Sequence, residues 1–259
     1  MKKTLFACVL ICALLLGCSS GGGGGGATHT VTFNSNGGTA VSPITGVEEG
    51  DTITAPPDPI KGYAFEGWYK DVGLTDDWDF GSDTVTANIT LYAKWGAYDG
   101  SLNIGDTGPG GGKIFYRPGT SFTMTGIGTC YYLEVAPADQ GEFVWSETNA
   151  DIDTGTTIGT GKNNTNLICS AHPGDDNAAN ACADYRGPNN FSDWFLPSKD
   201  ELNELYIQKG VVGGFTTNNY WASSQNASNL AWIQYFGNGT QSSGYTKGSQ
   251  YPVRAIRAF

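Results

Sequence analysis

The chain has 259 residues and a formal net charge of −11 at pH 7, although only 15% of its residues are charged. An acidic surface repels phosphate backbones, which excludes nucleic acid as an expected partner. Aromatic residues reach 12% and glycine is abundant, a composition typical of turn-rich β structure with aromatic cores rather than of helical bundles.

Residues 1–17 have the pattern of a bacterial signal peptide. Two lysines precede an apolar run over residues 5–16, which is shorter than the roughly 20 residues of a membrane-spanning helix. The run ends in Leu15-Leu16-Gly17-Cys18, which resembles the lipobox of bacterial lipoproteins. That resemblance implies cleavage before Cys18, palmitate or other acyl chains on this cysteine, and membrane attachment through the lipid. The expected location is the cell envelope, at the outer membrane or cell surface.

Residues 18–28 follow as a predicted tether, because six consecutive glycines bury nothing and sample many conformations. A folded unit is expected over residues 29–95. Alternation predicts strands at residues 30–33 and 85–95, and Asn36-Gly37-Gly38 predicts a turn between strands.

Four motifs in this unit occur together in a known repeat. They are Val31-Thr32-Phe33 with Asn36-Gly37-Gly38, Gly62-Tyr63-Ala64-Phe65-Glu66-Gly67-Trp68-Tyr69, Trp78-Asp79-Phe80, and Leu91-Tyr92-Ala93-Lys94-Trp95. This set resembles the Listeria–Bacteroides repeat of bacterial surface proteins, also called the internalin B-repeat. The resemblance implies a small β-grasp-like module that serves as a stalk or interaction unit. Its predicted core consists of five aromatic residues, namely Phe33, Phe65, Trp68, Phe80 and Trp95.

Residues 96–101 are a predicted joint, and residues 102–259 a second domain. Its glycine-rich start departs from both the phosphate-loop and the dinucleotide-binding patterns, so we expect a turn that leads into a strand. Further strands are expected at residues 131–137, 143–145, 220–224, 231–236 and 253–259. Helices are expected at residues 176–185 and 198–209. The second helix has a capping box, Ser198 with Glu201, and Gly210 as its predicted stop.

The second domain resembles the C-terminal domain of the Legionella collagen-like adhesin family. The shared motifs are Ile104-Gly105-Asp106-Thr107-Gly108-Pro109-Gly110-Gly111-Gly112, Tyr132-Leu133-Glu134-Val135-Ala136-Pro137, Asp193-Trp194-Phe195-Leu196-Pro197-Ser198-Lys199-Asp200-Glu201-Leu202, Tyr220-Trp221-Ala222-Ser223-Ser224 and Val253-Arg254-Ala255-Ile256-Arg257-Ala258-Phe259. The helix entry and the closing strand are also similar to the C-type-lectin-like superfold. The implied fold class is α+β, a β-grasp-like repeat followed by a C-type-lectin-like domain. Members include adhesins for sulfated polysaccharides, but this chain lacks the collagen repeat, and its second domain has more acidic than basic residues.

The predicted ligand site lies in residues 213–246, where the lectin-like resemblance places recognition loops. Amide groups offer hydrogen bonds to sugar hydroxyls, and exposed aromatic rings stack on sugar faces. The predicted ligand-binding residues are Asn226, Asn238, Tyr245, Asn218 and Gln241. The segment from Asp151 to Asp176 is the alternative location for this site.

The sequence also offers candidate residues for a metal site and for a disulfide. Oxygen ligands for calcium are offered by Asp151, Asp153, Asp175 and Asp176, although Asp and Gly clusters commonly form turns. No other cofactor is expected. One disulfide can form among the cysteines after Cys18, and we favour Cys169–Cys182, with Cys130 as an alternative partner for either.

The expected function is binding rather than catalysis, because the sequence shows no convincing nucleophile or acid–base pair. The leading hypothesis is a lipid-anchored surface protein that presents a lectin-like domain to an extracellular glycan or surface protein. A structural envelope component that contacts a partner protein or peptidoglycan is the alternative, and an exported hydrolase is the third.

Overall fold

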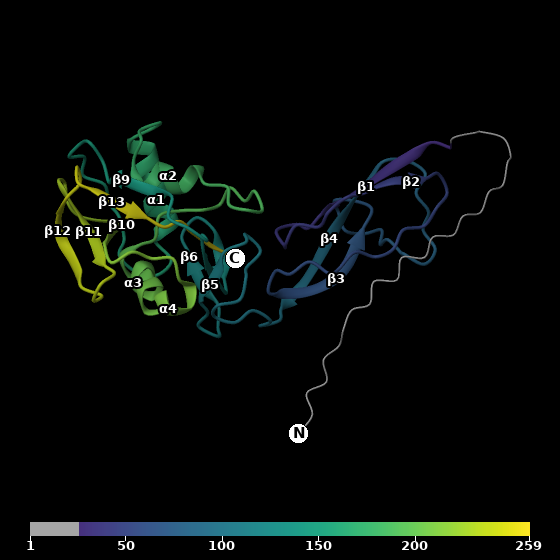
Figure 1. The fold of residues 1–259 in the computed structure, drawn as a ribbon, viewed down its shortest axis with the longest axis horizontal. Coiled ribbons are helices and arrows are strands. Elements are labelled where there is room, and N and C mark those ends of the chain that lie inside the picture. Colours follow the sequence, from purple (N-terminus) through teal and green to yellow (C-terminus); the bar gives the residue numbers. More distant parts are fainter. Residues whose placement is uncertain (1–25) are drawn as a thin grey trace, which may run out of the picture.

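The structure is a computed structural model and describes residues 26–259 (Figure 1). The predicted signal peptide over residues 1–17, the lipidation site Cys18 and the tether up to residue 25 lie outside the described residues. Between residues 26 and 259, no helix is both long enough and apolar enough to cross a bilayer.

The repeat is built on one four-stranded sheet with the strand order β2-β1-β4-β3. Its strands are β1 (Thr28–Asn34), β2 (Ile44–Glu48), β3 (Tyr63–Tyr69) and β4 (Ile89–Tyr98). The two central strands, β1 and β4, run parallel, and the outer pairs are antiparallel. No helix accompanies the sheet among residues 26–98, so the structure does not establish the β-grasp assignment.

The aromatic core of the repeat is close to the one predicted from sequence. Phe33 and Trp68 are buried, and their rings meet edge to face at 4.8 Å between centroids. The other three predicted core residues, Phe65, Phe80 and Trp95, are partly buried and pack against this cluster. Trp78, which belongs to one of the repeat motifs but not to the predicted core, is also buried in this cluster.

The second domain, called the terminal domain below, holds ten strands in four small sheets. They are β5 (Lys113–Tyr116), β6 (Phe122–Met124), β7 (Gly128–Cys130), β8 (Leu133–Val135), β9 (Gly141–Val144), β10 (Asn219–Ala227), β11 (Leu230–Tyr235), β12 (Gln241–Thr246), β13 (Gln250–Val253) and β14 (Ile256–Ala258). The sheet orders are β10-β11-β12, β13-β9, β14-β8-β5 and β6-β7. The closing segment, predicted as one strand over residues 253–259, is therefore two strands that pair with different partners.

Four helices complete the terminal domain, where two were predicted. They are α1 (Gly161–Ala171), α2 (Ala178–Asp184), α3 (Lys199–Ile207) and α4 (Lys209–Val212). The helix α1 was not predicted, because its sequence is rich in Asn and its first turn has no side-chain cap. Long-range bonds hold it instead: Asn164 donates to the Gly155 carbonyl at 2.7 Å, and the Thr165 hydroxyl accepts from the Leu196 amide at 3.0 Å.

The predicted capping box of α3 is confirmed. The Ser198 hydroxyl accepts from the Glu201 amide, and the Glu201 carboxylate accepts from the Ser198 amide at 2.7 Å. Gly210, however, does not stop the helix, because α4 continues through it and the chain leaves at Gly213 with a φ of 74°. A left-handed φ is the geometry that favours glycine at a helix end.

Two large buried clusters form most of the core of the terminal domain. One contains Trp145, Trp194 and Trp221 together with residues of α1 and α2. The other contains Phe195 and Tyr220 together with residues of α3 and the β14-β8-β5 sheet. The first cluster also receives Phe143 of β9, so its apolar burial fixes α2 against the segment around β9.

The repeat and the terminal domain are in contact next to the joint. Tyr63 of β3 meets Tyr131 edge to face, with 6.0 Å between ring centroids. Gly62 is buried and has a φ of 79°, and a Cβ at this position would lie 2.4 Å from the ring of Tyr132. The two domains therefore share a packed contact that depends on a glycine.

We expect Gly62→Ala to destabilise this contact beyond the cost of backbone strain alone. Gly46 is the matched control, because its φ of 72° is similar but no atom lies within 4 Å of a Cβ there. Gly62→Ala should lower the free energy of unfolding by about 1–3 kcal/mol more than Gly46→Ala, the range for forced overpacking. Urea denaturation of both variants measures the difference, and equal losses would show that the contact with Tyr132 is not tight.

Candidate functional site

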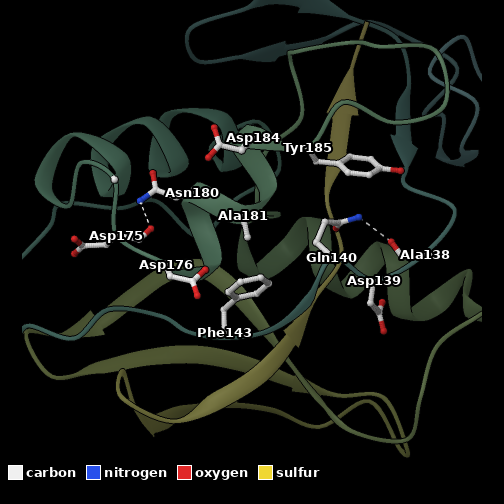
Figure 2. A pocket seen from close by; sticks show the side chains of 11 residues that line it. Ala138, Asp139, Gln140, Phe143, Asp175, Asp176, Asn180, Ala181, Asp184 and Tyr185 are labelled. Carbon is white, nitrogen blue, oxygen red and sulfur yellow. Dashed lines mark hydrogen bonds between the residues drawn. The ribbon is translucent and has the colours of Figure 1, made fainter.

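The candidate site is a solvent-open cleft of about 580 Å³ between α2 and the segment around β9 (Figure 2). The loop before α2, α2 itself and the following Tyr185 contribute one side, and residues 138–143 the other. Its lining residues are Ala138, Asp139, Gln140, Phe143, Gly174, Asp175, Asp176, Asn180, Ala181, Asp184 and Tyr185. We call this space the α2–β9 cleft.

The framework of the cleft is fixed by backbone capping. The Asn177 side chain accepts hydrogen bonds from the amides of Ala179 and Asn180, both at 3.0 Å, and so starts α2. Asn180 in turn donates to the carbonyls of His172 and Asp175, the second of which Figure 2 draws as a dashed line. The acidic loop is therefore tied to the helix that follows it.

Four aspartates give the cleft its charge, and they differ in their partners. Asp139 is committed to structure, because its carboxylate pairs with Arg254 and accepts from the Tyr220 hydroxyl at 2.8 Å. Asp175 lies 3.5 Å from the His172 ring. Asp176 and Asp184 are exposed, and within residues 26–259 neither side chain has a hydrogen-bond or ion-pair partner.

Aromatic rings stand beside these carboxylates. Phe143 of β9 is partly buried and lines the cleft near Asp176 (Figure 2). Tyr185 follows α2 directly, and its ring is held edge to face against the buried Trp194 at 5.2 Å between centroids. Partial burial raises the pKa of the Tyr185 hydroxyl, so it stays protonated and able to donate. The cleft thus combines acceptors, a hydroxyl donor and apolar faces.

The residues predicted for ligand binding do not come together. Much of the segment 213–246 is not loop but the β10-β11-β12 sheet. Asn226 and Tyr245 lie toward the β10–β11 turn, whereas Asn218 and Asn238 lie at the opposite end, beside the β11–β12 turn. Because the length of strand β11 lies between the two groups, one small ligand cannot touch both.

Several of these side chains also have structural partners. Gln241 lies at the Asn238 end of the sheet and donates to the Lys199 carbonyl at 2.8 Å and to Gln234 at 2.9 Å. Asn238 accepts from the Thr240 amide at 3.0 Å and shapes the β11–β12 turn. The Tyr245 ring packs on Tyr251 at 5.6 Å between centroids. These contacts give each of the three side chains a structural role that requires no ligand.

The calcium candidates are also divided. Asp175 and Asp176 line the α2–β9 cleft, whereas Asp151 accepts a hydrogen bond from Gln225 and Asp153 lies outside the cleft. Across residues 26–259, no three His, Cys, Asp or Glu side chains are grouped to hold a metal ion. The two aspartate pairs that the sequence offered as calcium candidates therefore stay apart, and neither is part of such a group.

The three cysteines of the terminal domain are free thiols, so the predicted Cys169–Cys182 disulfide is not formed in this structure. The two residues lie on the packed helices α1 and α2 and share one core cluster, which places them in the same region but without a bond. Burial raises the pKa of the Cys169 thiol to about 11 and that of Cys182 well above its ordinary value. Cys130 belongs to the other core cluster.

Comparison with known proteins characterises the repeat. Residues 29–94 match the model of the Listeria-Bacteroides repeat domain, so this segment of the chain is such a repeat, as the motifs predicted. Two relatives from Evansella cellulosilytica are 53% and 50% identical over 68 residues. They carry the provisional names Gly-rich membrane protein and membrane protein.

Both matches are short. Each covers 26% of this chain, and 8% and 10% of the respective relative. Among solved structures, a fimbrial protein from Bacteroides ovatus aligns over 90% of this chain and 69% of its own, with 11% identity and a TM-score of 0.43. That likeness is too slight to indicate a shared fold. The lectin-like assignment of residues 102–259 stays a prediction.

Proposed function

We propose that the chain is a membrane-anchored surface protein whose terminal domain binds an extracellular glycan in the α2–β9 cleft. The observation that carries this proposal is the pairing of exposed, unpartnered carboxylates, Asp176 and Asp184, with the faces of Phe143 and Tyr185. The lipobox at Cys18 and the membrane-protein names of the two relatives support the surface location.

The chemistry of the cleft selects among glycans. Carboxylates accept hydrogen bonds from sugar hydroxyls and attract amino groups, and aromatic rings pack against the apolar face of a pyranose. The unpartnered carboxylates of Asp176 and Asp184 repel sulfate and carboxylate groups. The proposed ligands are therefore neutral and amino sugars, in contrast to the sulfated polysaccharides bound by some members of the adhesin family that the terminal domain resembles.

We expect Asp176→Asn combined with Tyr185→Ala to reduce glycan binding about tenfold or more, since each lost contact of this kind is worth about 1 kcal/mol or more. Asp153→Asn is the matched control, because Asp153 is an exposed aspartate outside the cleft. A glycan array with neutral, amino and sulfated glycans measures binding, and thermal melting verifies that the variants are folded. Full binding by a folded double variant, or a preference for sulfated glycans, would contradict the proposal.

The same array separates this function from that of a structural envelope component. Peptidoglycan fragments contain amino sugars, and retention on them alone would favour the structural role. The absence of catalysis remains part of the proposal, and a screen of hydrolase substrates tests it.

A further inference from the structure

Lys247 is a lysine whose side chain is almost completely enclosed. It lies in the turn between β12 and β13 and is only 1% exposed. Its Nζ donates to the Ala150 carbonyl at 2.8 Å and to Oε1 of Gln225 at 2.6 Å, and it stands 4.3 Å from the centroid of the Trp145 ring. Lysine is rarely buried to this extent, so the neighbours of this amine decide what it does.

The carboxamide of Gln225, on β10, is held from both sides. Its Oε1 accepts from the Ile152 amide at 3.1 Å as well as from Lys247, and its Nε2 donates to the Asp151 carboxylate. An amine, an amide carbonyl, a backbone donor on that carbonyl and a carboxylate at the amide nitrogen therefore lie in one row. Each of these groups has a role in amide exchange.

We propose that Lys247 and Gln225 become joined by an intramolecular amide bond. The Lys247 nitrogen attacks the Gln225 Cδ and forms a new C–N bond, and the C–N bond to the side-chain nitrogen of Gln225 breaks. Once both nitrogens are bonded to Cδ, the Asp151 carboxylate, which accepts a hydrogen bond from the departing nitrogen, relays a proton to it from the attacking one. The departing nitrogen then leaves as ammonia. No oxidant, reductant or co-reactant is consumed, because the two groups exchange one amide for another.

The geometry meets the main requirements of this step. Because a C=O bond is about 1.2 Å long, Nζ lies within about 3.8 Å of Cδ, close to a near-attack distance. The Ile152 amide donates to the oxygen on which negative charge develops. Burial lowers the pKa of the Lys247 ammonium to about 8, although Asp151 opposes this shift. The free amine, which is the nucleophile, is therefore populated near neutral pH.

The bond would link β10 to the turn that follows β12. Such a covalent loop limits the unfolded chain in the way a disulfide does, but thiols and reductants do not cleave it. A link of this kind stabilises a protein displayed outside the cell without a disulfide between the cysteines of the terminal domain.

Trypsin digestion of the denatured full chain provides the test. Trypsin cleaves after free lysine, and the fragment that follows Lys209 ends at Lys247 and contains Gln225. We expect cleavage at Lys247 to be blocked. The product should be a peptide of residues 210–254 that is about 17 Da lighter than its sequence, the mass of ammonia. Fragmentation should connect residues 225 and 247.

The controls distinguish this bond from a different reaction that loses ammonia and from a missed cleavage. A succinimide at Asn238-Gly239 also loses ammonia but leaves cleavage after Lys247 intact, and a missed cleavage gives residues 210–254 at full mass. Either result, or the two separate peptides 210–247 and 248–254 at full mass, overturns the proposal. Lys247→Met must abolish the joined peptide. A wild-type yield of joined peptide in Asp151→Asn would overturn the role of that carboxylate.

Discussion

Arg257→Met should be among the most destabilising single substitutions in the terminal domain, with a loss of about 3–5 kcal/mol in the free energy of unfolding. The Arg257 guanidinium donates to Glu134 at 3.0 Å and makes two hydrogen bonds to Asp193 at 2.9 Å. Glu134 is fully buried, and burial raises its pKa while Arg257 and the amides of Gly110 and Gly112 oppose that shift. Removal of the cation leaves a buried carboxylate without its counter-charge.

The control for this substitution is Arg186→Met, because Arg186 is exposed and donates only to nearby carbonyls. Urea denaturation followed by tryptophan fluorescence measures both variants. Adding Glu134→Gln to Arg257→Met should recover part of the loss, since the neutral amide still offers an oxygen to the glycine amides. No recovery in the double variant would show that lost packing, rather than the uncompensated charge, causes the effect.

Glu201→Ala should cost about 2–4 kcal/mol in the free energy of unfolding. Its fully buried carboxylate accepts from the amides of Ser198 at 2.7 Å and Gly159 at 2.8 Å, and so joins the start of α3 to the segment before α1. Truncation leaves buried donors without an acceptor and removes the capping box. Glu204→Ala on the same helix is the control, because Glu204 is only partly buried. Equal losses in the two variants would refute this role.

Glu201 should also give the stability a characteristic pH dependence. Burial raises the pKa of this carboxyl from an ordinary value of 4.5 to about 7, although its hydrogen bonds oppose the shift. Between these values the folded chain holds a proton that the unfolded chain has released. The free energy of unfolding should therefore fall by up to about 3 kcal/mol as the pH rises from 4.5 to 7, and then level off. Glu201→Gln should flatten this slope, and an unchanged slope would contradict the assignment.

The sequence by itself determined the repeat and several local features of the terminal domain. The repeat was identified through the resemblance of its motifs to a known family. The alternation through β4 was read locally, because a strand's period indicates which side chains face the core. The capping box at Ser198 and Glu201 was equally local, since both partners lie within one helical turn.

Only the tertiary structure decided where the groups of the two proposed sites meet. The α2–β9 cleft combines Phe143 with Asp176, and the Lys247 amine reaches Gln225, through packing between segments far apart in the chain. The same packing separates Asn226 from Asn238, although the two are close in sequence, because β11 runs between them. Local periodicity indicates which face of a strand or helix is buried. Which side chains meet in a site depends on how distant elements bury one another's apolar surface.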